Sequence, residues 1–223
     1  MRAARDLLRR RTRIVRHGAD LKAHVKNTTS QYNLPAMNLN LRYDFARDAM
    51  RNRFDDDCVQ RNIDLDLNII AFYKHELSSV ECFIEKHAKH HSGSDYHILT
   101  SFPGIGRILA LTILYEIGDI ARFNTVQDFA SYSRLIKCKA ESAGKSYGTQ
   151  GNKIGNAHLK WAFGEIAVLY LRGNDKAKAH LLKLQKRMSK AKALSALAHK
   201  IGRCVYYMLK NQKVFDEKRF LAG

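Results

Sequence analysis

The sequence predicts an all-α protein in which a long coiled-coil-type helix is followed by a compact helical domain. Apolar residues recur at three- and four-residue spacing in most segments, and none alternates as a half-buried strand does. The 223 residues include 13 glycines and 2 prolines, so few positions interrupt a helix. A hydrophobic content of 45% is enough to build a core.

Three helices are expected in the first ninety residues. Apolar residues alternate with arginines over 3–27, and Asn27–Ser30 is expected to end that helix before a second one over 39–53. The region 58–90 has the most regular pattern, a seven-residue repeat of Ile63, Ile70, Leu77 and Ile84. Such a heptad predicts pairing with another helix, either within the chain or in a second copy of it.

The segment Ser92-Gly93-Ser94 is expected to close this helix, so we place a domain boundary there. The two regions are a basic N-terminal helix with the coiled coil over 1–92, and a compact domain over 93–223. That domain should contain a short helix near 95–101, a turn at 103–106 and a buried helix ending near 117. Thr125 and Asp128 form a variant capping box that starts a helix ending near Tyr132.

Residues 136–155 lack any period and contain four glycines, a composition typical of a functional or mobile loop. Helices are expected after it over 156–172, 175–189 and 190–211, because the apolar residues again recur at helical spacing.

Positive charge is concentrated in blocks. Residues 1–30 have nine Lys/Arg and two Asp, residues 137–160 have five Lys and one Glu, and residues 172–220 have fourteen Lys/Arg and three acids. The net charge is +18, so the rest of the chain is slightly acidic. This distribution is typical of a protein that binds a polyanion, and nucleic acid fits better than an anionic membrane, because the basic segments lack an aromatic opposite face.

Several other classes are disfavoured. The four cysteines lie far apart without metal-ligand spacing, so we interpret them as buried thiols of a reducing compartment and assign no metal. The run Asp55-Asp56-Asp57 cannot converge on one ion, because consecutive residues on a turn point apart. No apolar run approaches the length of a membrane span, and the arginine-rich start is unlike a secretory leader, so we expect a cytoplasmic protein that does not bind membranes.

The turn Pro103-Gly104-Ile105-Gly106 precedes a helix and Arg107. Glycines allow close backbone approach, and free amides at a helix start bind anions, so Gly104, Ile105, Gly106 and Arg107 are candidate contacts to a DNA phosphate. The pattern resembles the hairpin of helix-hairpin-helix proteins. An ordinary tight turn between buried helices is the alternative.

The glycine-rich loop offers Ser142 and Ser146 beside several lysines. A serine that attacks a phosphodiester needs nearby cations to stabilise the developing charge. Most loop serines only bond to local backbone, so the spacing by itself leaves both interpretations open.

The ordered motifs PGIG, EIGD, RF, SAGK, KIGN and LKW, preceded by RDLLRRR and NTTSQYNLP, give the chain a wider likeness. From about Arg5 to Asp216 it resembles the bacterial insertion-sequence transposases of the one-hundred-and-ten group, which resemble both RuvC-like nucleases and serine recombinases and use a structured bridge RNA.

The resemblance implies a DNA recombinase in which Ser142 is the catalytic nucleophile, within the motif Ser142-Ala143-Gly144. It places Lys145, Lys153, Asn156 and Lys160 in the basic DNA-binding segment that follows. It also implies DNA and a structured guide RNA as partners, and homo-oligomers paired through residues 58–90. The chain differs from the family at Ser133-Arg134-Leu135 and Lys137, where Ala-Gly-Leu and a proline are usual.

Family members begin with a RuvC-like domain whose four acidic residues bind divalent metal, and Arg5 aligns just after it. The resemblance therefore implies a truncated form with no cofactor in this chain and divalent metal only in the missing domain. The alternatives are a non-catalytic DNA- or RNA-binding dimer, which needs only the charge, the turn and the coiled coil, and a coiled-coil scaffold, which leaves the charge unexplained.

Overall fold

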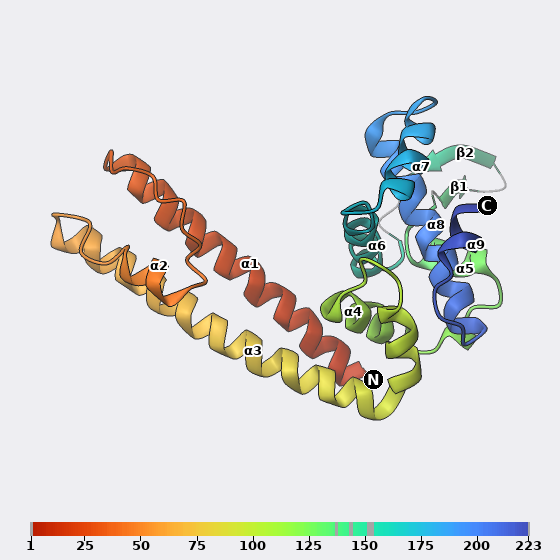
Figure 1. Cartoon of the computed structure of the whole chain (residues 1–223), viewed down its shortest axis with the longest axis horizontal. Helices are drawn as coiled ribbons and strands as arrows, with labels where there is room; N and C mark the ends of the chain where they lie inside the picture. The colour runs from red at the N-terminus through yellow and green to blue at the C-terminus, as the bar shows by residue number, and fades with distance from the viewer. Residues whose placement is uncertain (1, 137, 143–144, 151–153, 223) are drawn as a thin grey trace. The chain divides into compact units, whose positions relative to one another are not determined.

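The computed structural model describes residues 2–136, 138–142, 145–150 and 154–222, with side chains described except at 91, 138–142, 146–150 and 222. The chain divides into an N-terminal unit, residues 6–84, and a C-terminal unit, residues 1–5 and 85–223. The division falls at Ile84 and Glu85, and the boundary expected at residue 92 instead marks a kink. Helices dominate both units, as the sequence predicts (Figure 1).

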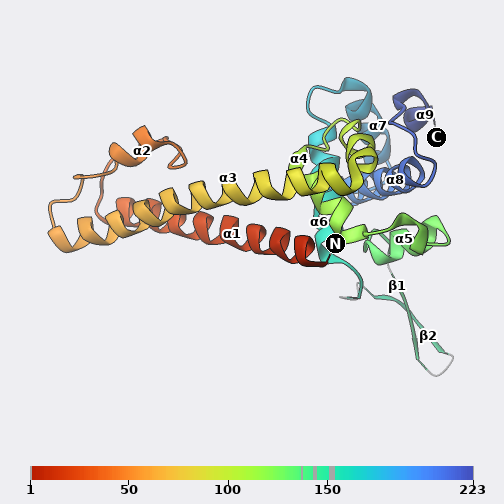
Figure 2. The ribbon, with the colours of Figure 1, turned by 90° about the horizontal axis from the view of Figure 1, so that it is seen from below.

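The N-terminal unit is built on two long helices, α1 (Arg2–Gln31) and α3 (Asp57–Thr100), which run antiparallel and side by side (Figures 1 and 2). Ile63, Ile70 and Ile84 of the heptad are buried, and Ile63 and Ile70 share a core cluster with Val25 of α1. The heptad therefore pairs helices within the chain. Arg11 and Glu81 join α1 to α3 through Nη2 and Oε1 at 2.6 Å.

Helix α1 continues through the break expected at Asn27–Ser30. Thr28 and Thr29 are buried, and the Thr29 hydroxyl donates to the Val25 carbonyl at 2.8 Å, so the polar side chains bond along the helix instead of ending it. The helix ends at Gln31, two residues before Asn33, whose φ of 53° is left-handed.

The helix expected over 39–53 is wrong in extent, since only α2 (Asp44–Asp48) forms. The Arg47 side chain is buried and donates to the carbonyls of Leu41 and Arg42, which holds the preceding segment in a non-helical path. Asn52 then adopts a φ of 58°. A buried guanidinium bonded to backbone thus overrides the local helical preference.

Helix α3 extends past the expected stop and includes the short helix expected near 95–101. Ser92, with φ −151° and ψ 46°, marks a kink where two helices meet. Cys58 and Cys82 are exposed on this helix, so the expectation of buried thiols is wrong for both.

The C-terminal unit packs α6 (Ala157–Tyr170) against α4 (Arg107–Ile117) and α8 (Lys190–Lys210), with α5 (Val126–Tyr132) and α7 (Asp175–Gln185) also on α8. Helix α4 is buried from Leu109 to Ile117, as its all-round apolar sequence predicts. The capping box of Thr125 and Asp128 is confirmed at the start of α5. Two short elements were not expected: the 3-10 helix η1 (Ile120–Arg122) and the helix α9 (Glu217–Ala222).

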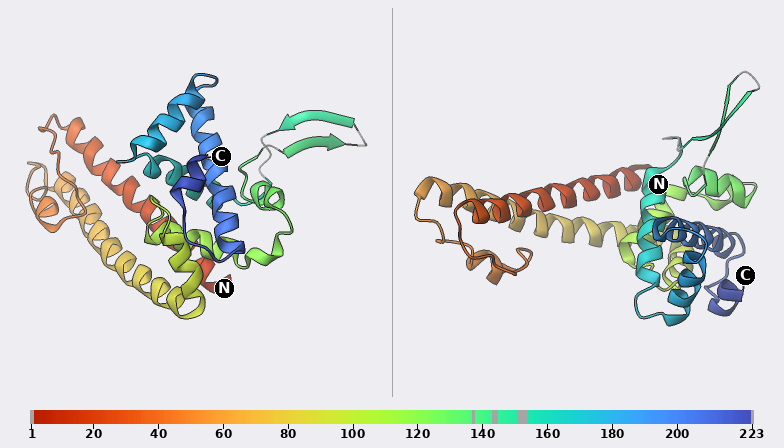
Figure 3. Two further views of the ribbon diagram at one scale, coloured as in Figure 1. Left: turned by 45° about the vertical axis from the view of Figure 1, so that its right-hand side comes forward. Right: turned by 90° about the horizontal axis from the view of Figure 1, so that it is seen from above.

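The segment without a period contains an antiparallel hairpin of β1 (Cys138–Ser142) and β2 (Lys145–Gln150). We expected no strand here. The hairpin forms a two-stranded ribbon that leaves the helices of the C-terminal unit (Figure 3), and its register shifts between Lys139 and Glu141. The two strands are only five and six residues long, so the sequence offers little periodicity from which to predict them.

Candidate nucleic-acid interface

The root of the hairpin joins the end of α5 to the start of α6. The Asn156 backbone amide donates to the Tyr132 carbonyl at 2.6 Å, and Arg134 Nε donates to the Ile154 carbonyl at 2.9 Å. These two bonds connect the chain entering the hairpin to the chain leaving it. The root is therefore closed by residues outside the strands.

Gly155 is required at this root. Its φ is +96°, and a Cβ there would lie 2.7 Å from the Tyr132 carbonyl oxygen and 3.1 Å from Arg134 Cγ. A side chain would be strained both by its own backbone and by its neighbours. The glycine thus lets the returning chain pass against the end of α5.

Asn156, expected as a DNA contact, is instead a buried structural residue. Its Oδ1 accepts from the amides of His158 and Leu159 and so caps α6, while its Nδ2 donates to Glu116 Oε2 at 2.7 Å. With the weaker bond from Nδ2 to the Tyr132 hydroxyl, all four side-chain bonds lie inside the unit. The side chain positions the root of the hairpin and has no capacity left for a phosphate.

Glu116 is only 1% exposed and lies at the centre of this polar cluster. Tyr132 accepts a hydrogen bond from Asn156 Nδ2 at 3.4 Å, and the Arg122 guanidinium lies 4.4 Å from the Tyr132 ring centroid. Burial opposes ionisation of Tyr132, but hydrogen bonds from Asn156 and Arg122, with the charge of Arg122, together lower its pKa. Glu116 belongs to the EIGD motif, but no sequence signal shows that it bonds to Asn156.

Leu135 anchors the entry to the hairpin on α8. Its side chain lies so close to Gly202 that a Cβ at that glycine would collide with Leu135 Cδ1. Its amide donates to the Ala130 carbonyl at 2.9 Å. The departure from the family pattern at residues 133–135 thus still yields a packed hairpin root.

Ser142, the candidate nucleophile, is the last residue of β1. In the hairpin it is paired across the strands with Lys145, the first residue of β2. The Ser142 side chain lies outside the described side chains, and Ala143, Gly144 and Lys153 lie outside the described residues. The Lys145 side chain is exposed.

The turn at 103–106 uses its two glycines differently. Gly104 has a φ of +96°, and a Cβ there would lie 2.9 Å from the Tyr170 amide nitrogen, so this glycine permits close packing on the end of α6. A Cβ at Gly106 would meet nothing within 4 Å. Because glycine has no side chain, Gly106 does not cap α4. The amides in the first turn of α4 therefore have no side-chain partner at the N-cap and can bind an anion.

Ile105, expected as a DNA contact, is 4% exposed and its amide donates to the Phe102 carbonyl at 3.0 Å. It anchors the turn and offers a phosphate neither side chain nor amide. Of the three residues expected to contact DNA through this turn's backbone, only Gly106 presents an open face.

Arg107, the candidate contact beside the turn, forms an ion pair with Glu85. Its Nη1 lies 3.3 Å from Glu85 Oε2, and Lys89 Nζ lies 2.8 Å from Glu85 Oε1. The hydrogen bond from Lys89, which outweighs the opposing effect of burial, lowers the pKa of Glu85 with help from the charges of Lys89 and Arg107. Two cations around one carboxylate leave a net positive charge beside the open amides of α4.

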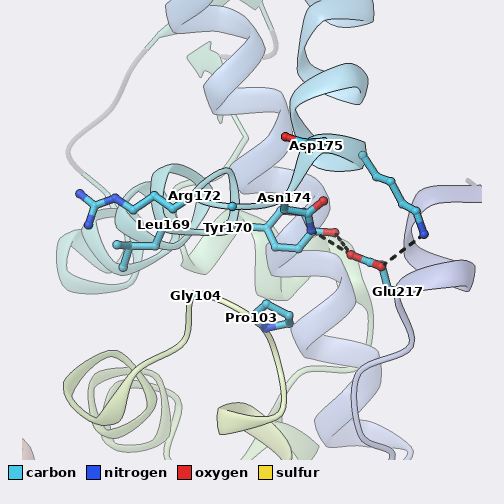
Figure 4. A pocket seen from close by; sticks show the side chains of 10 residues that line it. Pro103, Gly104, Leu169, Tyr170, Arg172, Asn174, Asp175 and Glu217 are labelled. Carbon is cyan, nitrogen blue, oxygen red and sulfur yellow. Dashed lines mark hydrogen bonds and ion pairs between the residues drawn. The ribbon is translucent and has the colours of Figure 1, made fainter.

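A cleft of about 470 Å³ lies between the turn, the α6–α7 connection and Glu217 (Figure 4). Glu217 accepts from Asn174 Nδ2 at 2.8 Å and from the Tyr170 hydroxyl at 3.5 Å. Burial, followed by the charge of Glu217, raises the pKa of Tyr170 to about 12. Glu217 thus fastens α9 to the α6–α7 corner and makes this side of the turn less cationic.

Lys160 is exposed on α6, as expected of a DNA contact, and the neighbouring Trp161 is 42% exposed. Trp161 belongs to the LKW motif, but neither helical periodicity nor charge in the sequence marks it as a contact residue. An exposed indole beside a lysine can stack on a base or a sugar.

The described residues do not fit a metal site. No group of three or more His, Cys, Asp or Glu side chains gathers within the part of the chain that the structure describes. Asp56 of the acidic run caps α3, accepting from the amides of Cys58 and Val59. His87 bonds to the Tyr115 hydroxyl at 2.9 Å. Within the described ranges, no helix combines the length and apolar character that crossing a bilayer requires.

Comparison with known proteins points to mobile DNA elements. The family described as Transposase IS116/IS110/IS902 matches residues 96–182. A mini-circle protein of Streptomyces coelicolor, named as the transposase for IS117, is 29% identical over 135 residues, which cover 58% of this chain and 31% of that protein. An uncharacterized 43.6 kDa protein of insertion element IS110 from the same organism is 28% identical over 127 residues, 56% of this chain and 31% of its own length.

The chain spans about a third of the length of these curated relatives. The matched segment begins in the last turns of α3 and contains the 103–106 turn, the hairpin with Ser142 and the buried Glu116–Asn156 pair. Residues 96–182 of this chain are therefore similar to the transposase domain of the IS116/IS110/IS902 family.

Proposed function

We propose that this chain acts in DNA transposition, breaking and rejoining phosphodiesters through Ser142. The observation that carries the proposal is the family match over 96–182, which includes Ser142 and the helices that form the hairpin root. DNA is the proposed substrate and a structured guide RNA a proposed second partner. The proposed compartment is the bacterial cytoplasm, where chromosomal DNA lies.

The proposed chemistry is a pair of transesterifications. Ser142 Oγ attacks the phosphorus, a P–Oγ bond forms, the bond to one deoxyribose oxygen breaks, and that oxygen takes up the proton lost by the serine. In the second step a deoxyribose hydroxyl attacks the phosphoserine and releases the serine with its proton. Nearby cations stabilise the charge that develops on the phosphorane oxygens.

The geometry supports this assignment in two ways. The root of the hairpin is closed by Asn156, Gly155 and Arg134, so the strand that carries Ser142 leaves a fixed base. The exposed Lys145 is the register partner of Ser142. A lysine at the backbone position paired with Ser142 supplies a cation for a phosphate bound there.

Among the described residues, the carboxylates do not gather into a metal site. We propose that strand exchange requires an acidic domain that holds the divalent metal of the family. No step above is assigned to the metal.

A second copy of the chain is a further proposed partner. The heptad expected to pair protomers is used within the N-terminal unit, but α3 has a second apolar stripe of exposed side chains. It contains Leu65 and Phe72, seven residues apart, and Ile69 and Phe83, fourteen apart, and Phe72 is 60% exposed. This stripe has the heptad spacing of a helix-pairing surface.

The catalytic proposal is tested by trapping a covalent complex with labelled DNA, with an acidic domain of a longer relative added in trans. We expect an adduct that resists denaturation and is lost in Ser142→Ala. The matched control is Ser146→Ala, a second hydroxyl in the same hairpin, which should keep the adduct. An adduct that survives Ser142→Ala, or disappears in both variants, contradicts the assignment.

The alternative is a dimeric nucleic-acid-binding protein without chemistry of its own. It needs only the basic surfaces and the exposed stripe of α3, both of which the structure contains. Binding that weakens steeply with salt, with no adduct under any of these conditions, would favour it.

A further inference from the structure

A groove of about 1080 Å³ runs between the C-terminal half of α8 and the segment that leads into α9. We call it the C-terminal groove, and define it by Lys200, Arg203, Tyr207, Lys213 and Arg219, which line it together with apolar residues. It lies after the segment matched by the family, which ends at residue 182. Neither the motifs nor the proposed chemistry uses it.

The C-terminal groove is strongly cationic. Its lining contains one carboxylate, Asp216, and four cationic side chains: Lys200, Arg203, Lys213 and Arg219. Within the described part of the chain none of the four cations has an ion-pair partner, and Asp216 Oδ1 accepts from the Arg219 backbone amide at 3.1 Å. The groove therefore holds an excess of about three positive charges over a concave surface, which concentrates an anion there.

Two other titratable groups of the groove add no charge. Burial raises the pKa of the Cys204 thiol to about 11, so it stays protonated and does not neutralise the lysines. Burial, and then the charge of Arg203, lowers the pKa of His199, so its imidazole is neutral at pH 7.

Lys200 is the most unusual member. Its ammonium nitrogen is buried and has no hydrogen-bond partner within the described residues. The nearest favourable contact is the Phe220 ring, whose centroid lies 5.1 Å away. A buried ammonium without an acceptor is costly, and burial accordingly lowers the pKa of Lys200. An anion entering the groove would supply the missing hydrogen bond and favour the charged form.

The groove also has an aromatic surface. Tyr207 lines it and is 47% exposed, while its ring packs edge-on against Tyr206 with centroids 5.3 Å apart. Tyr206 is itself fixed, because its hydroxyl donates to the Phe123 carbonyl at 3.2 Å. Tyr207 is therefore a supported aromatic platform beside unpaired cations, a combination that single-stranded nucleic acids use.

We propose that the C-terminal groove binds a single-stranded segment of nucleic acid, with a phosphate between Lys200 and Arg203 and an unpaired base stacked on Tyr207. This inference rests on the proposed function, since it assumes that the chain works on nucleic acid. A duplex fits less well, because its bases are already stacked on one another and cannot reach a side-chain ring. An acidic peptide would satisfy the cations but leave the ring unused.

The test uses the full chain and fluorescence anisotropy with a labelled oligothymidylate, the same strand as RNA, a matched duplex and an abasic strand. Lys200→Met should weaken binding of all single strands about tenfold or more. The variant should fold, because methionine is apolar and of similar length. Lys192→Met, on the same helix outside the groove, should change affinity by no more than about twofold.

Tyr207→Ala should weaken binding of the strands with bases about tenfold and leave the abasic strand unchanged, whereas Tyr207→Phe should keep full affinity. If the substitutions weaken binding of the DNA and RNA strands equally, the groove recognises only phosphate and base. If they weaken binding of one strand more, that strand is identified as the ligand. Each of these results supports the proposal.

If Lys200→Met and Tyr207→Ala bind single strands like the wild type while duplex binding persists, the groove proposal is wrong and the proposed function stands. Displacement of the strand by polyglutamate at equal charge concentration would also overturn it, since bases would then contribute nothing. If the wild type binds neither strand nor duplex, the proposed function is wrong as well.

Discussion

Asn156 and Glu116 lie forty residues apart in the chain, yet Asn156 Nδ2 donates to Glu116 Oε2 at 2.7 Å in a buried hydrogen bond. The same asparagine caps α6 and accepts two backbone amides. One side chain thus joins the end of α4 to the start of α6, at the point where the hairpin of Ser142 returns to the helices.

Replacing Asn156 with alanine should destabilise the C-terminal unit by about 2–4 kcal/mol, because it removes a helix cap and one hydrogen bond to the buried Glu116 carboxylate. Trp161, the chain's single tryptophan, lies on α6 and reports unfolding of this unit in urea. The matched control is Asn174→Ala. Asn174 also caps a helix and bonds to a carboxylate, but Glu217 is 37% exposed, so the loss should be about 1 kcal/mol. Equal losses would contradict the buried role of Asn156.

The two glycines of the 103–106 turn should respond oppositely to alanine. Gly104→Ala should cost about 1–3 kcal/mol of stability, because its φ is positive and the new Cβ would press on the Tyr170 amide. Gly106→Ala has an ordinary φ of −80° and open space, so stability should change by less than about 0.5 kcal/mol. Its effect should appear in DNA affinity, because the methyl group holds a phosphate away from the amides of α4. Unchanged affinity in Gly106→Ala would exclude this turn as a phosphate contact.

Substitutions in the two apolar stripes of α3 should affect folding and association separately. Ile70→Ala, in the buried stripe, should lower the stability of the N-terminal unit by about 2–4 kcal/mol. Phe72→Ser, in the exposed stripe, should leave the fold unchanged and shift the chain toward monomer in sedimentation equilibrium. A chain that is monomeric before the substitution, or an assembly that Phe72→Ser does not weaken, would contradict pairing through this stripe.

Stability should fall as the pH decreases from about 7.5 to about 5.5, on either side of the ordinary pKa of histidine. Burial is the main cause that lowers the pKa of both His180 and His199; the charges of Lys200 and Lys183 add to it for His180, and that of Arg203 for His199. The unfolded chain therefore takes up protons near pH 6.5, where a free imidazole titrates, and the folded chain takes them up only at lower pH. The stabilisation is complete above that pH and decreases below it. His199→Gln should reduce the slope of the thermal midpoint against pH. A slope equal to that of the wild type would show that the pKa of His199 is the same in the folded and the unfolded chain.

The sequence predicts a helix correctly where a periodic pattern of apolar residues or a capping motif marks it. The capping box of Thr125, the heptad of α3 and the all-round apolar helix α4 each have a periodic or capping signal, and each is confirmed. The heptad alone could not select its partner, since a second copy and α1 offer the same kind of surface. The buried cluster with Val25 decides for α1.

The remaining features depend on tertiary contacts that no local pattern encodes. Asn156 reads as a polar residue in a basic loop, but its burial against Glu116 comes from the packing of α4 on α6. Gly104 and Gly106 look alike in the motif. They differ only in their surroundings, because Gly104 packs against α6 and Gly106 is open. Lys200 belongs to a basic helix in the sequence, and its lack of an acceptor emerges only once α9 closes over it.

The closed root of the hairpin has a consequence for protein engineering. Because Asn156, Gly155 and Arg134 seal the base without help from the strands, the ribbon can be lengthened, shortened or exchanged while the helices keep their packing. Foreign peptides grafted onto this arm should be displayed by an unaltered scaffold.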